Sequence, residues 1–388
     1  MRLNPLGGIA AGALGLALPL ALIPATASAA PEPTPLLTVA QAPAAAEIKN
    51  RYIVTVKAGS DPAAVAEARS VTPDFVYDSV LNGFAASLTS GQLTAVRGDA
   101  RVLAVEEDQK AASTATQTNP TWGLDRIDQR SGRNSAYTYT GTGAGVTAYI
   151  IDSGIDTGHP DFGGRARNVF DAFGGNGADC NGHGTHVAGT VGGGTHGVAK
   201  RVQLRGVKVL NCQGSGSFSA IIAGFDWVRQ NAVKPAVANA SLGGGYSAAL
   251  NNAATALADS GVHTTVAAGN SNQDACNFSP ASAPNALSIA ASDSGDAKAG
   301  FSNHGRCTDL YGPGVGVVST RMGGGTTSMN GTSMAAPHVA GVAALYKAAR
   351  GEAPSATVNA WLINNSTPNV IRGNISGTPN RLLFTSGL

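Results

Sequence analysis

The sequence is poor in charged residues and, beyond its N-terminal region, in long apolar runs. Only 13% of the 388 residues are charged, and the formal net charge is +2. No basic stripe is interleaved with aromatic residues, so we do not expect nucleic acid as a partner. No later segment offers about 20 uninterrupted apolar residues, the length of a transmembrane helix, so we expect no membrane span in the mature protein.

The N-terminal region has the pattern of a secretory signal. A single charge, Arg2, precedes an apolar run from Ala10 to Pro24 and the small residues Ala27 to Ala29. This pattern predicts a signal peptide over residues 1–29 and a soluble, secreted, extracellular mature protein.

Cysteine is also scarce. The four cysteines all follow residue 179, and no Cys-x-x-Cys motif occurs. In an exported chain an even number favours disulfides over a metal cluster or a redox pair. Four cysteines allow three pairings, and pairing the sequence neighbours is one of them.

The chain is long enough for a full hydrophobic core, and we expect two domains after the signal. Residues 30–46 are rich in Pro and Ala and read as a linker. The first domain is expected over residues 46–110. Its patterns predict strands and helices that make a compact α+β unit of the βαββαβ type. The strands are expected at Tyr52–Val56, Gly83–Leu88 and Val102–Glu106, and the helices at Asp61–Ala68 and Gln92–Arg97. Residues 110–116, small and polar, predict an exposed joint that a protease can cut.

In the rest of the chain, the stretch from Asn330 to Tyr346 predicts a buried helix that begins near Ser333, because Ala, Val and Leu dominate it without a charge. Pro337 is expected in the first turn, where a missing N–H costs little. Unpaired N–H groups and the helix dipole at this end suit a hydroxyl that must become a nucleophile. The simpler interpretation is a serine that only caps a core helix.

An aspartate ends the next strong pattern. The run from Gly145 to Ile155 is almost continuously apolar and predicts a strand buried on both faces, with Asp152 near its C-terminal end. Ligands bind at that end of open α/β sheets, and a buried aspartate is costly unless it is hydrogen-bonded. Taken alone, Asp152 could equally be a turn residue.

Two histidines follow in the stretch Asp179 to Thr190. Glycines lead into a helix of small residues, with His183 at its N-terminal end and His186 one turn inside. A zinc site is the alternative, but Gly184 stands where the His-Glu-x-x-His motif has its glutamate, and a third ligand is missing. We therefore expect His186, like His338, to be a core histidine.

These stretches resemble the signatures of the subtilisin-like serine protease family, peptidase S8, in that family's chain order Asp, His, Ser. The similar motifs are Asp152-Ser153-Gly154, His183-Gly184-Thr185-His186 and Gly331 to Pro337. The resemblance covers residues 115–388 and is strongest to the proteinase K and aqualysin branch. It also rests on Trp122–Gln129, Gly214–Gly216, Ile221–Gly224 and Ser241–Gly245. It implies an α/β, three-layer fold with a mostly parallel sheet between helices.

The resemblance implies a role for each motif. Ser333 would be the nucleophile, His183 the general base and acid, and Asp152 the residue that holds the imidazole. Asn270 would donate to the oxyanion. Substrate would lie extended between two backbone edges, which makes specificity broad, with a mild preference for an apolar or aromatic residue before the cut. The edges would be Gly214, Ser215 and Gly216 on one side and Ser241, Leu242 and Gly243 on the other.

The same resemblance implies two disulfides and structural calcium. The cysteine spacings are similar to those of aqualysin-type proteases, with Cys180 paired to Cys212 and Cys276 to Cys307. Oxygen ligands for calcium would come from two groups of residues. The first is Pro284, Ala286 and Asp309; the second is Asp125, Asp128 and Gln129. The loop after the second group departs from the branch pattern and lacks a further carboxylate. Plain surface carboxylates are the alternative at both places.

The small domain resembles the inhibitor I9-like propeptide of these proteases in Tyr52–Val54, Gly83–Ala86 and Val105–Asp108. An unrelated ferredoxin-like module is the alternative. The resemblance predicts a secreted serine endopeptidase made as a preproprotein, with a propeptide over 30–114 and a catalytic domain over 115–388. The propeptide would assist folding, inhibit the enzyme and be removed by self-cleavage near Thr114-Ala115. We expect a monomer with protein and peptide substrates, and no domain appended after Phe384.

Two other classes of protein fit the sequence less well. A family member that only binds peptides would be expected to have lost one of Asp152, His183 and Ser333, and none is lost. A serine esterase of the α/β-hydrolase type needs Gly-x-Ser-x-Gly and the order Ser, Asp, His, whereas Ser333 lies between Thr332 and Met334.

Overall fold

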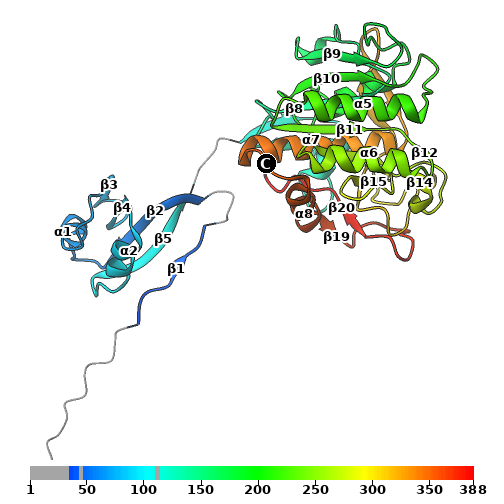
Figure 1. Cartoon of the computed structure of the whole chain (residues 1–388). Coiled ribbons are helices and arrows are strands. Elements are labelled where there is room, and N and C mark those ends of the chain that lie inside the picture. Colours follow the sequence, from blue (N-terminus) through cyan, green and yellow to red (C-terminus); the bar gives the residue numbers. More distant parts are fainter. Residues whose placement is uncertain (1–34, 43–46, 110–113) are drawn as a thin grey trace, which may run out of the picture. The chain divides into compact units, whose positions relative to one another are not determined.

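The computed structural model describes residues 35–42, 47–109 and 114–388. The predicted signal peptide lies outside the described residues, as do parts of the predicted linker and joint. The chain divides into two compact units, Met1–Lys110 and Ala111–Leu388, and each is described by itself (Figure 1). Among the described residues, no helix is both long and apolar enough to cross a membrane.

The first unit is a five-stranded sheet with two helices, in the strand order β1-β5-β2-β4-β3. Its core is formed by alternate strand residues such as Val54, Phe84 and Val105, which pack with residues of the helices. Thr89 caps α2 reciprocally with Gln92, as the sequence suggests for a helix start here. The bounds are β1 Val39–Ala40, β2 Glu47–Val56, α1 Pro62–Glu67, β3 Phe75–Tyr77, β4 Gly83–Ser87, α2 Ser90–Arg97 and β5 Val102–Gln109. The βαββαβ order is therefore confirmed.

Two details at the ends of this unit differ from the sequence predictions. Part of the expected linker is strand β1, which pairs in parallel with β5 because Leu37 and Val39 are apolar and pack on the core. The end of the expected joint is also a strand: β6 (Ala115–Thr118) pairs antiparallel with β7 (Ala136–Tyr139) in the second unit. Ala115 and Thr116 are nevertheless exposed, as predicted.

The second unit is built on a nine-stranded sheet in the order β19-β20-β16-β15-β13-β11-β8-β10-β9. All its neighbouring pairs are parallel except β19 with β20. The central strands are continuously buried because helices cover both faces. The strands are β8 Thr147–Asp152, β9 Ala166–Asp171, β10 Gln203–Lys208, β11 Ala236–Ala240, β13 His263–Ala267, β15 Leu287–Ser292, β16 Leu310–Pro313, β19 Thr367–Pro368 and β20 Arg381–Leu382.

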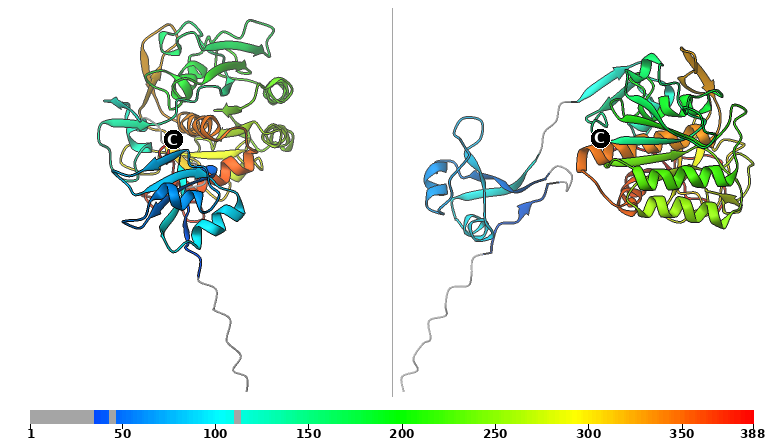
Figure 2. Two further views of the ribbon diagram at one scale, coloured as in Figure 1. Left: turned by 90° about the vertical axis from the view of Figure 1, so that its left-hand side faces the viewer. Right: turned by 45° about the horizontal axis from the view of Figure 1, so that its top comes forward.

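Helices form the outer layers of this unit. Helices α5 and α6 lie side by side on one face, and α4 and α7 pack on the other (Figures 1 and 2). The predicted three-layer α/β fold is thus confirmed. The helices are α3 Trp122–Ile127, α4 His183–Gly192, α5 Phe218–Asn231, α6 Ala248–Asp259, α7 Thr332–Arg350 and α8 Ser355–Asn365. Two short antiparallel pairs complete it: β12 Gly244–Gly245 with β14 Phe278–Ser279, and β17 Val317–Thr320 with β18 Thr326–Met329.

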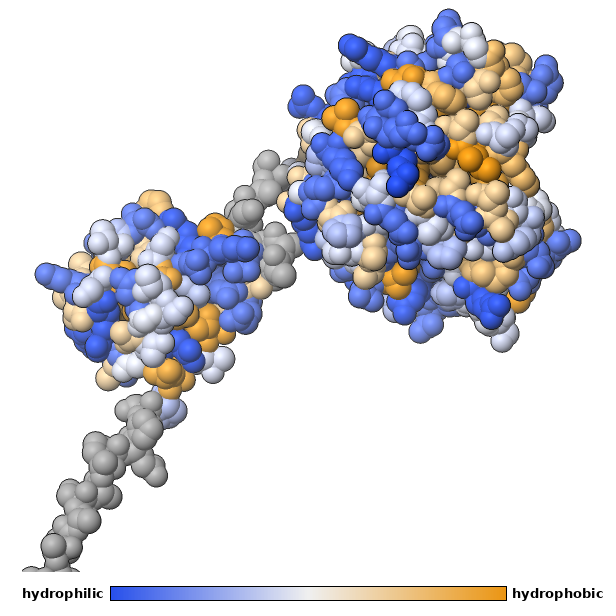
Figure 3. Space-filling view, viewed as in Figure 1, coloured by the Kyte–Doolittle hydropathy of each residue, from blue (hydrophilic) through white to orange (hydrophobic). Residues whose placement is uncertain are grey.

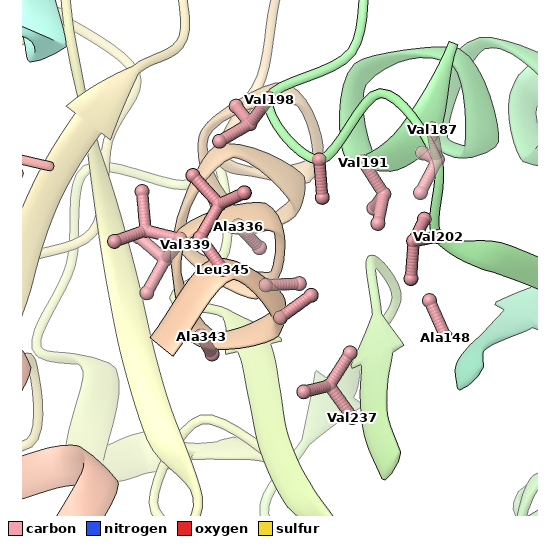
Figure 4. Packing of buried hydrophobic residues seen from close by; sticks show 14 of the residues in the cluster. Ala148, Val187, Val191, Val198, Val202, Val237, Ala336, Val339, Ala343 and Leu345 are labelled. Carbon is pink, nitrogen blue, oxygen red and sulfur yellow. The ribbon is translucent and has the colours of Figure 1, made fainter. Parts of the chain in front are cut away.

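Helix α7 runs through the centre of the larger core. Its small and branched side chains, Ala336, Val339, Ala343 and Leu345 among them, belong to the same buried cluster as valines of α4 and of the following loop (Figure 4). A Cβ atom at Gly341 would lie only 2.5 Å from that of Val198, so close packing here depends on a glycine. The tight packing gives α7, and with it the serine at its start, a fixed position.

On the surface of the molecule, apolar residues occur among the hydrophilic ones (Figure 3).

Candidate active site

The fold brings the three predicted catalytic residues to one edge of the sheet. Asp152 is the last residue of β8 and has no exposed surface. His183 is the first residue of α4, and Ser333 is the second residue of α7. Both helices therefore present their N-termini at the carboxyl end of the parallel strands, where open α/β sheets form their sites.

Asp152 and His183 are directly bonded. The Nδ1 atom of His183 lies 2.8 Å from Oδ1 and 3.0 Å from Oδ2 of Asp152, so Asp152 can hold the tautomer whose Nε2 accepts a proton. Burial lowers the pKa of His183, but the charge of Asp152, its hydrogen bond and the charge of Asp179 together raise that pKa above the usual value. The pair is therefore arranged to stabilise an imidazolium.

The hydroxyl of Ser333 points to a carbonyl in this structure. Its Oγ donates to the carbonyl oxygen of Ser241 over 3.1 Å, and it has no hydrogen bond to His183 within the described part of the chain. Rotation about one side-chain bond turns the hydroxyl, and nucleophile–base bonds often tighten only when substrate is bound.

Pro337 lies inside α7 and not in its first turn, so that prediction was wrong. The helix begins at Thr332, and a residue at position 337 would normally donate its N–H to the carbonyl of Ser333. Proline has no N–H, and the hydroxyl of Ser241 donates to this carbonyl over 2.8 Å instead. Ser241 in turn accepts from the amide of Asn239 over 2.8 Å. Because Pro337 has no N–H, the carbonyl of Ser333 is free to accept from Ser241, the residue that follows β11, and this bond holds the backbone of Ser333.

Asn270 follows β13, and the oxygen of its side-chain amide is fixed by hydrogen bonds. Its Oδ1 accepts from both the N–H and the hydroxyl of Thr332, each over 2.9 Å. Its Nδ2 makes no hydrogen bond to any described residue and lies 3.5 Å from the position of a Cβ atom on Gly331. The donor therefore remains available beside the start of α7, as an oxyanion site requires.

A cleft of about 660 Å³ contains these groups. Both predicted substrate edges line it, together with His183, Asn270 and Ser333. Other lining residues were not predicted as part of the site, among them Phe218, Ile221, Ala267, Ala268, Phe278, Ser279 and Ala281. Ile221 lies in a stretch that resembles the family, and Ala267 and Ala268 lie just before Asn270, which were the signals in the sequence. At Gly243 a Cβ atom would come within 2.9 Å of the carbonyl oxygen of Ser279, because β12, which follows Gly243, pairs with β14.

The disulfides have the pairing that the family resemblance implies. Cys180 is bonded to Cys212, and Cys276 to Cys307, which leaves no free cysteine. The first bridge lies beside the active site, since Cys180 is three residues before His183 and Cys212 precedes the edge formed by Gly214 to Gly216.

The first predicted calcium group is brought together by the sheet. Asp309 immediately precedes β16, and its Oδ2 accepts from the N–H of Ser288 in the adjacent strand β15, over 2.8 Å. Ala286 immediately precedes that strand. Burial raises the pKa of Asp309. A half-buried carboxylate with one backbone donor to its side chain is compatible with a hard cation, although the carbonyl of Pro284 already accepts from the hydroxyl of Thr255 over 2.8 Å.

The second predicted calcium group fits a cation poorly. Both oxygens of Asp125 accept from backbone N–H groups, those of Asn134 and Ser135, over 2.8 and 3.1 Å. The amide nitrogen of Gln129 also points to Asp125. Within this group, Oδ1 of Asp128 is buried and has no hydrogen-bond partner among the described residues, and burial and the charge of Asp125 raise the pKa of Asp128. Among the described residues no three His, Cys, Asp or Glu side chains gather as metal ligands.

His186 and His338 each make a local hydrogen bond in the core. Nε2 of His186 pairs with the carbonyl of Val317 over 3.0 Å, and Nδ1 of His338 with that of Met334 over 2.9 Å. Neither ring lines the cleft. Their surroundings are those of structural histidines.

Comparison with known proteins gives consistent matches along the chain. Residues 143–383 match the Subtilase family, and residues 51–112 match Peptidase inhibitor I9. The chain is 45% identical to an extracellular serine proteinase of Thermus sp. (strain Rt41A), covering 96% of this chain and 99% of that protein. It is 42% identical to proteinase R of Parengyodontium album, covering 96% and 98%. A crystal structure of a cold adapted subtilisin-like serine proteinase is 47% identical, with a TM-score of 0.68, and covers 69% of this chain and 99% of that one.

Proposed function

Because this chain belongs to the subtilase family and is a subtilisin-like serine endopeptidase with an inhibitor I9 propeptide, we propose that Asp152, His183 and Ser333 carry its reaction. The observation that carries this assignment is the hydrogen bond of 2.8 Å between His183 and a fully buried Asp152, in the cleft that holds Ser333.

The proposed reaction is acyl transfer through a covalent intermediate. His183 takes the proton of Ser333 as the hydroxyl attacks the scissile carbonyl, and later gives it to the leaving amine. Asp152 keeps the imidazole in the required tautomer and stabilises the imidazolium. The negative oxygen of the tetrahedral intermediate is stabilised by Nδ2 of Asn270 and the N–H of Ser333.

We further propose that substrate is held mainly through its backbone. An extended peptide would add a strand between Gly214–Gly216 and Ser241–Gly243, both of which line the cleft. Backbone pairing is indifferent to side chains and gives broad specificity. The apolar walls, which include Leu242 and Ala268, favour an apolar or aromatic residue before the cut.

The proposed precursor consists of a signal peptide (1–29), a propeptide (30–114) and the catalytic domain (115–388). The relatives named extracellular proteinases support export. The I9 domain supports a role as inhibitor of its own catalytic domain, with self-cleavage near Thr114-Ala115. We also propose that the mature enzyme is a monomer that acts on proteins and peptides and binds no nucleic acid.

Calcium is proposed as a structural cofactor. Asp309 and the carbonyl groups of Pro284 and Ala286 would hold it, and it would neutralise a half-buried carboxylate and stabilise only the folded chain. The group at Asp125, Asp128 and Gln129 is not proposed as a second site, because amide donors occupy the Asp125 carboxylate.

The test of the assignment combines activity with mass. Secreted protein is incubated with denatured casein, with and without a serine-directed sulfonyl fluoride, and its intact mass is measured. We expect loss of activity, one adduct on Ser333 and an N-terminus near Ala115. The matched Ser333→Ala protein should form no adduct and remain full-length after signal removal. Processing of that variant in the absence of other proteases would contradict self-cleavage, and an adduct on another serine would contradict the assignment of the nucleophile.

A further inference from the structure

A second buried aspartate lies beside the proposed catalytic pair. Asp179, in the loop before α4, is only 8% exposed. Its Oδ1 accepts from the hydroxyl of Ser153 and from the N–H groups of Asn181 and Gly182, each over 2.9 Å. Its Oδ2 accepts from the N–H and the hydroxyl of Thr185, over 2.9 and 2.6 Å. All five contacts are donors, which is the pattern that an ionised carboxylate satisfies.

The donors belong to the two segments that carry the catalytic pair. Ser153 follows Asp152 and donates its N–H to Oδ1 of Asp152 over 2.7 Å. The hydroxyl oxygen of Ser153 also accepts from the N–H of Gly184 over 2.9 Å. On the other side, Gly182 and Thr185 flank His183 in the first turn of α4. Asp179 therefore joins the end of β8 to the start of α4.

The connection is largely buried, and neither Asp179, Ser153 nor Thr185 lines the cleft. Ser153 and Thr185 have no exposed surface. The carbonyl of Ser153 is held from another side by Nζ of Lys208, over 2.6 Å. The residue at the N-cap of α4 is Gly182, which has no side chain to cap the helix, so Asp179 accepts from the N–H groups of Gly182 and Thr185 instead.

We propose that Asp179 is a positioning residue of this enzyme, whose buried carboxylate sets the distance between Asp152 and His183 and whose charge favours the imidazolium form of His183. The proposal rests on the assignment of Asp152 and His183 made above. Asp179 touches neither substrate nor the reacting atoms. Two effects must follow from its loss, one on the rate and one on the pH dependence.

The rate effect follows from geometry. Asp179→Asn keeps the size of the side chain, but its Nδ2 cannot accept the hydrogen bonds now made to one carboxylate oxygen. The loop and the first turn of α4 must then move with respect to Ser153. Since charge-assisted hydrogen bonds are lost, we expect kcat/KM to fall roughly 10- to 100-fold.

The pH effect follows from charge. The charged or titratable groups that act on His183 are Asp152 from β8, Asp179 from the loop before α4 and His186 from α4. Lys208 from β10 contacts the carbonyl of Ser153 instead. Although burial lowers the pKa of His183, the charges of Asp152 and Asp179 raise it. Removal of the negative charge of Asp179 must therefore lower that pKa and move the acidic limb of kcat/KM to lower pH.

Asp161→Asn is the matched control. Asp161 is also a largely buried carboxylate that accepts from backbone N–H groups, those of Thr195 and His196, in the segment after the other end of α4. Its replacement should lower stability but leave the acidic limb of the pH profile of kcat/KM unchanged.

A third variant, Ser153→Ala, removes a neutral donor to Asp179. We expect a lower kcat and an unchanged acidic limb of the pH profile.

The experiment measures kcat/KM of all four proteins on one chromogenic peptide from pH 5 to 9, normalised to active sites titrated with a sulfonyl fluoride. The proposal is supported if Asp179→Asn has a lower kcat/KM and is the only variant in which the acidic limb of the pH profile moves to lower pH. An unmoved limb would overturn the electrostatic part, and an unchanged rate the positioning part. If Asp179→Asn is not secreted, the titration of His183 is followed by NMR in full-length Ser333→Ala, with and without Asp179→Asn. An equal pKa of His183 in the two proteins would overturn the electrostatic part of the proposal. Failure of the sulfonyl fluoride to label wild-type Ser333 would instead refute the underlying site assignment.

Discussion

Replacement of Gly184 by alanine tests how closely α4 must approach β8. A Cβ atom at this position would lie 2.1 Å from the carbonyl oxygen of Gly154 and 3.2 Å from Cβ of Asp152. The first obstacle is backbone, which cannot rotate away as a side chain does. Because Gly184 follows His183 in the same helical turn, any relief of the clash moves the imidazole relative to Asp152.

The size of the effect follows from these distances. Cβ atoms essentially never approach other heavy atoms within 3.0 Å, so the helix start must shift by at least about 0.9 Å, the difference between 3.0 and 2.1 Å. His183 and Asp152 are now 2.8 Å apart. A shift of this size along the bond would take it past hydrogen-bond range. Misplacement of a catalytic group by about 1 Å can cost about 100-fold in rate, or about 2.7 kcal/mol.

The assay compares kcat/KM of Gly184→Ala with that of wild type and of Gly300→Ala, on a chromogenic peptide with titrated active sites. Gly300 has no heavy atom within 4 Å of its Cβ position, so alanine there adds no clash. Thermal unfolding of each protein in the Ser333→Ala background reports stability without self-digestion. A Gly184→Ala enzyme with wild-type kcat/KM would refute the reasoning, because the helix would then have room that the structure does not show.

Three further predictions concern stability and are best measured by denaturant unfolding or thermal melting in the Ser333→Ala background. Replacement of both Cys276 and Cys307 by alanine should lower the free energy of unfolding by roughly 3 to 4 kcal/mol, the chain-entropy value for a separation of 31 residues; an unchanged unfolding midpoint would contradict this. Burial lowers the pKa of His338 to about 4, below the unfolded value of about 6.5, so the unfolded state binds more protons as pH falls through this window. Stability should decrease there by up to about 1.4 kcal/mol per pH unit for this residue, and His338→Gln should show a shallower decrease; equal slopes would argue against a buried neutral histidine. A calcium chelator should lower the melting temperature of the Ser333→Ala protein but not that of the same protein with Asp309→Asn. An equal drop in melting temperature in both proteins would mean that the ion binds elsewhere.

Much of the second unit could be predicted, because the sequence patterns that determine its elements are local. The run ending at Asp152 is apolar at every position, which only a strand covered on both faces tolerates, and β8 is buried throughout. Glycines before a stretch of small residues marked the start of α4 at His183. In each case the residues that determine the element lie within it, so the pattern could be interpreted without knowledge of the neighbours.

The tertiary structure decided the contacts between segments far apart in the chain. The missing N–H of Pro337 frees the carbonyl of Ser333 by local helix geometry, but no local pattern indicates that Ser241 donates to that carbonyl. Nor does one show that Asp179 bonds to Ser153, 26 residues earlier, and thereby joins the strand of Asp152 to the helix of His183. Such contacts depend on the order of strands in the sheet and on the close packing of helices against it. The motifs thus specify the reacting groups, whereas the distances between those groups are set by the packed fold.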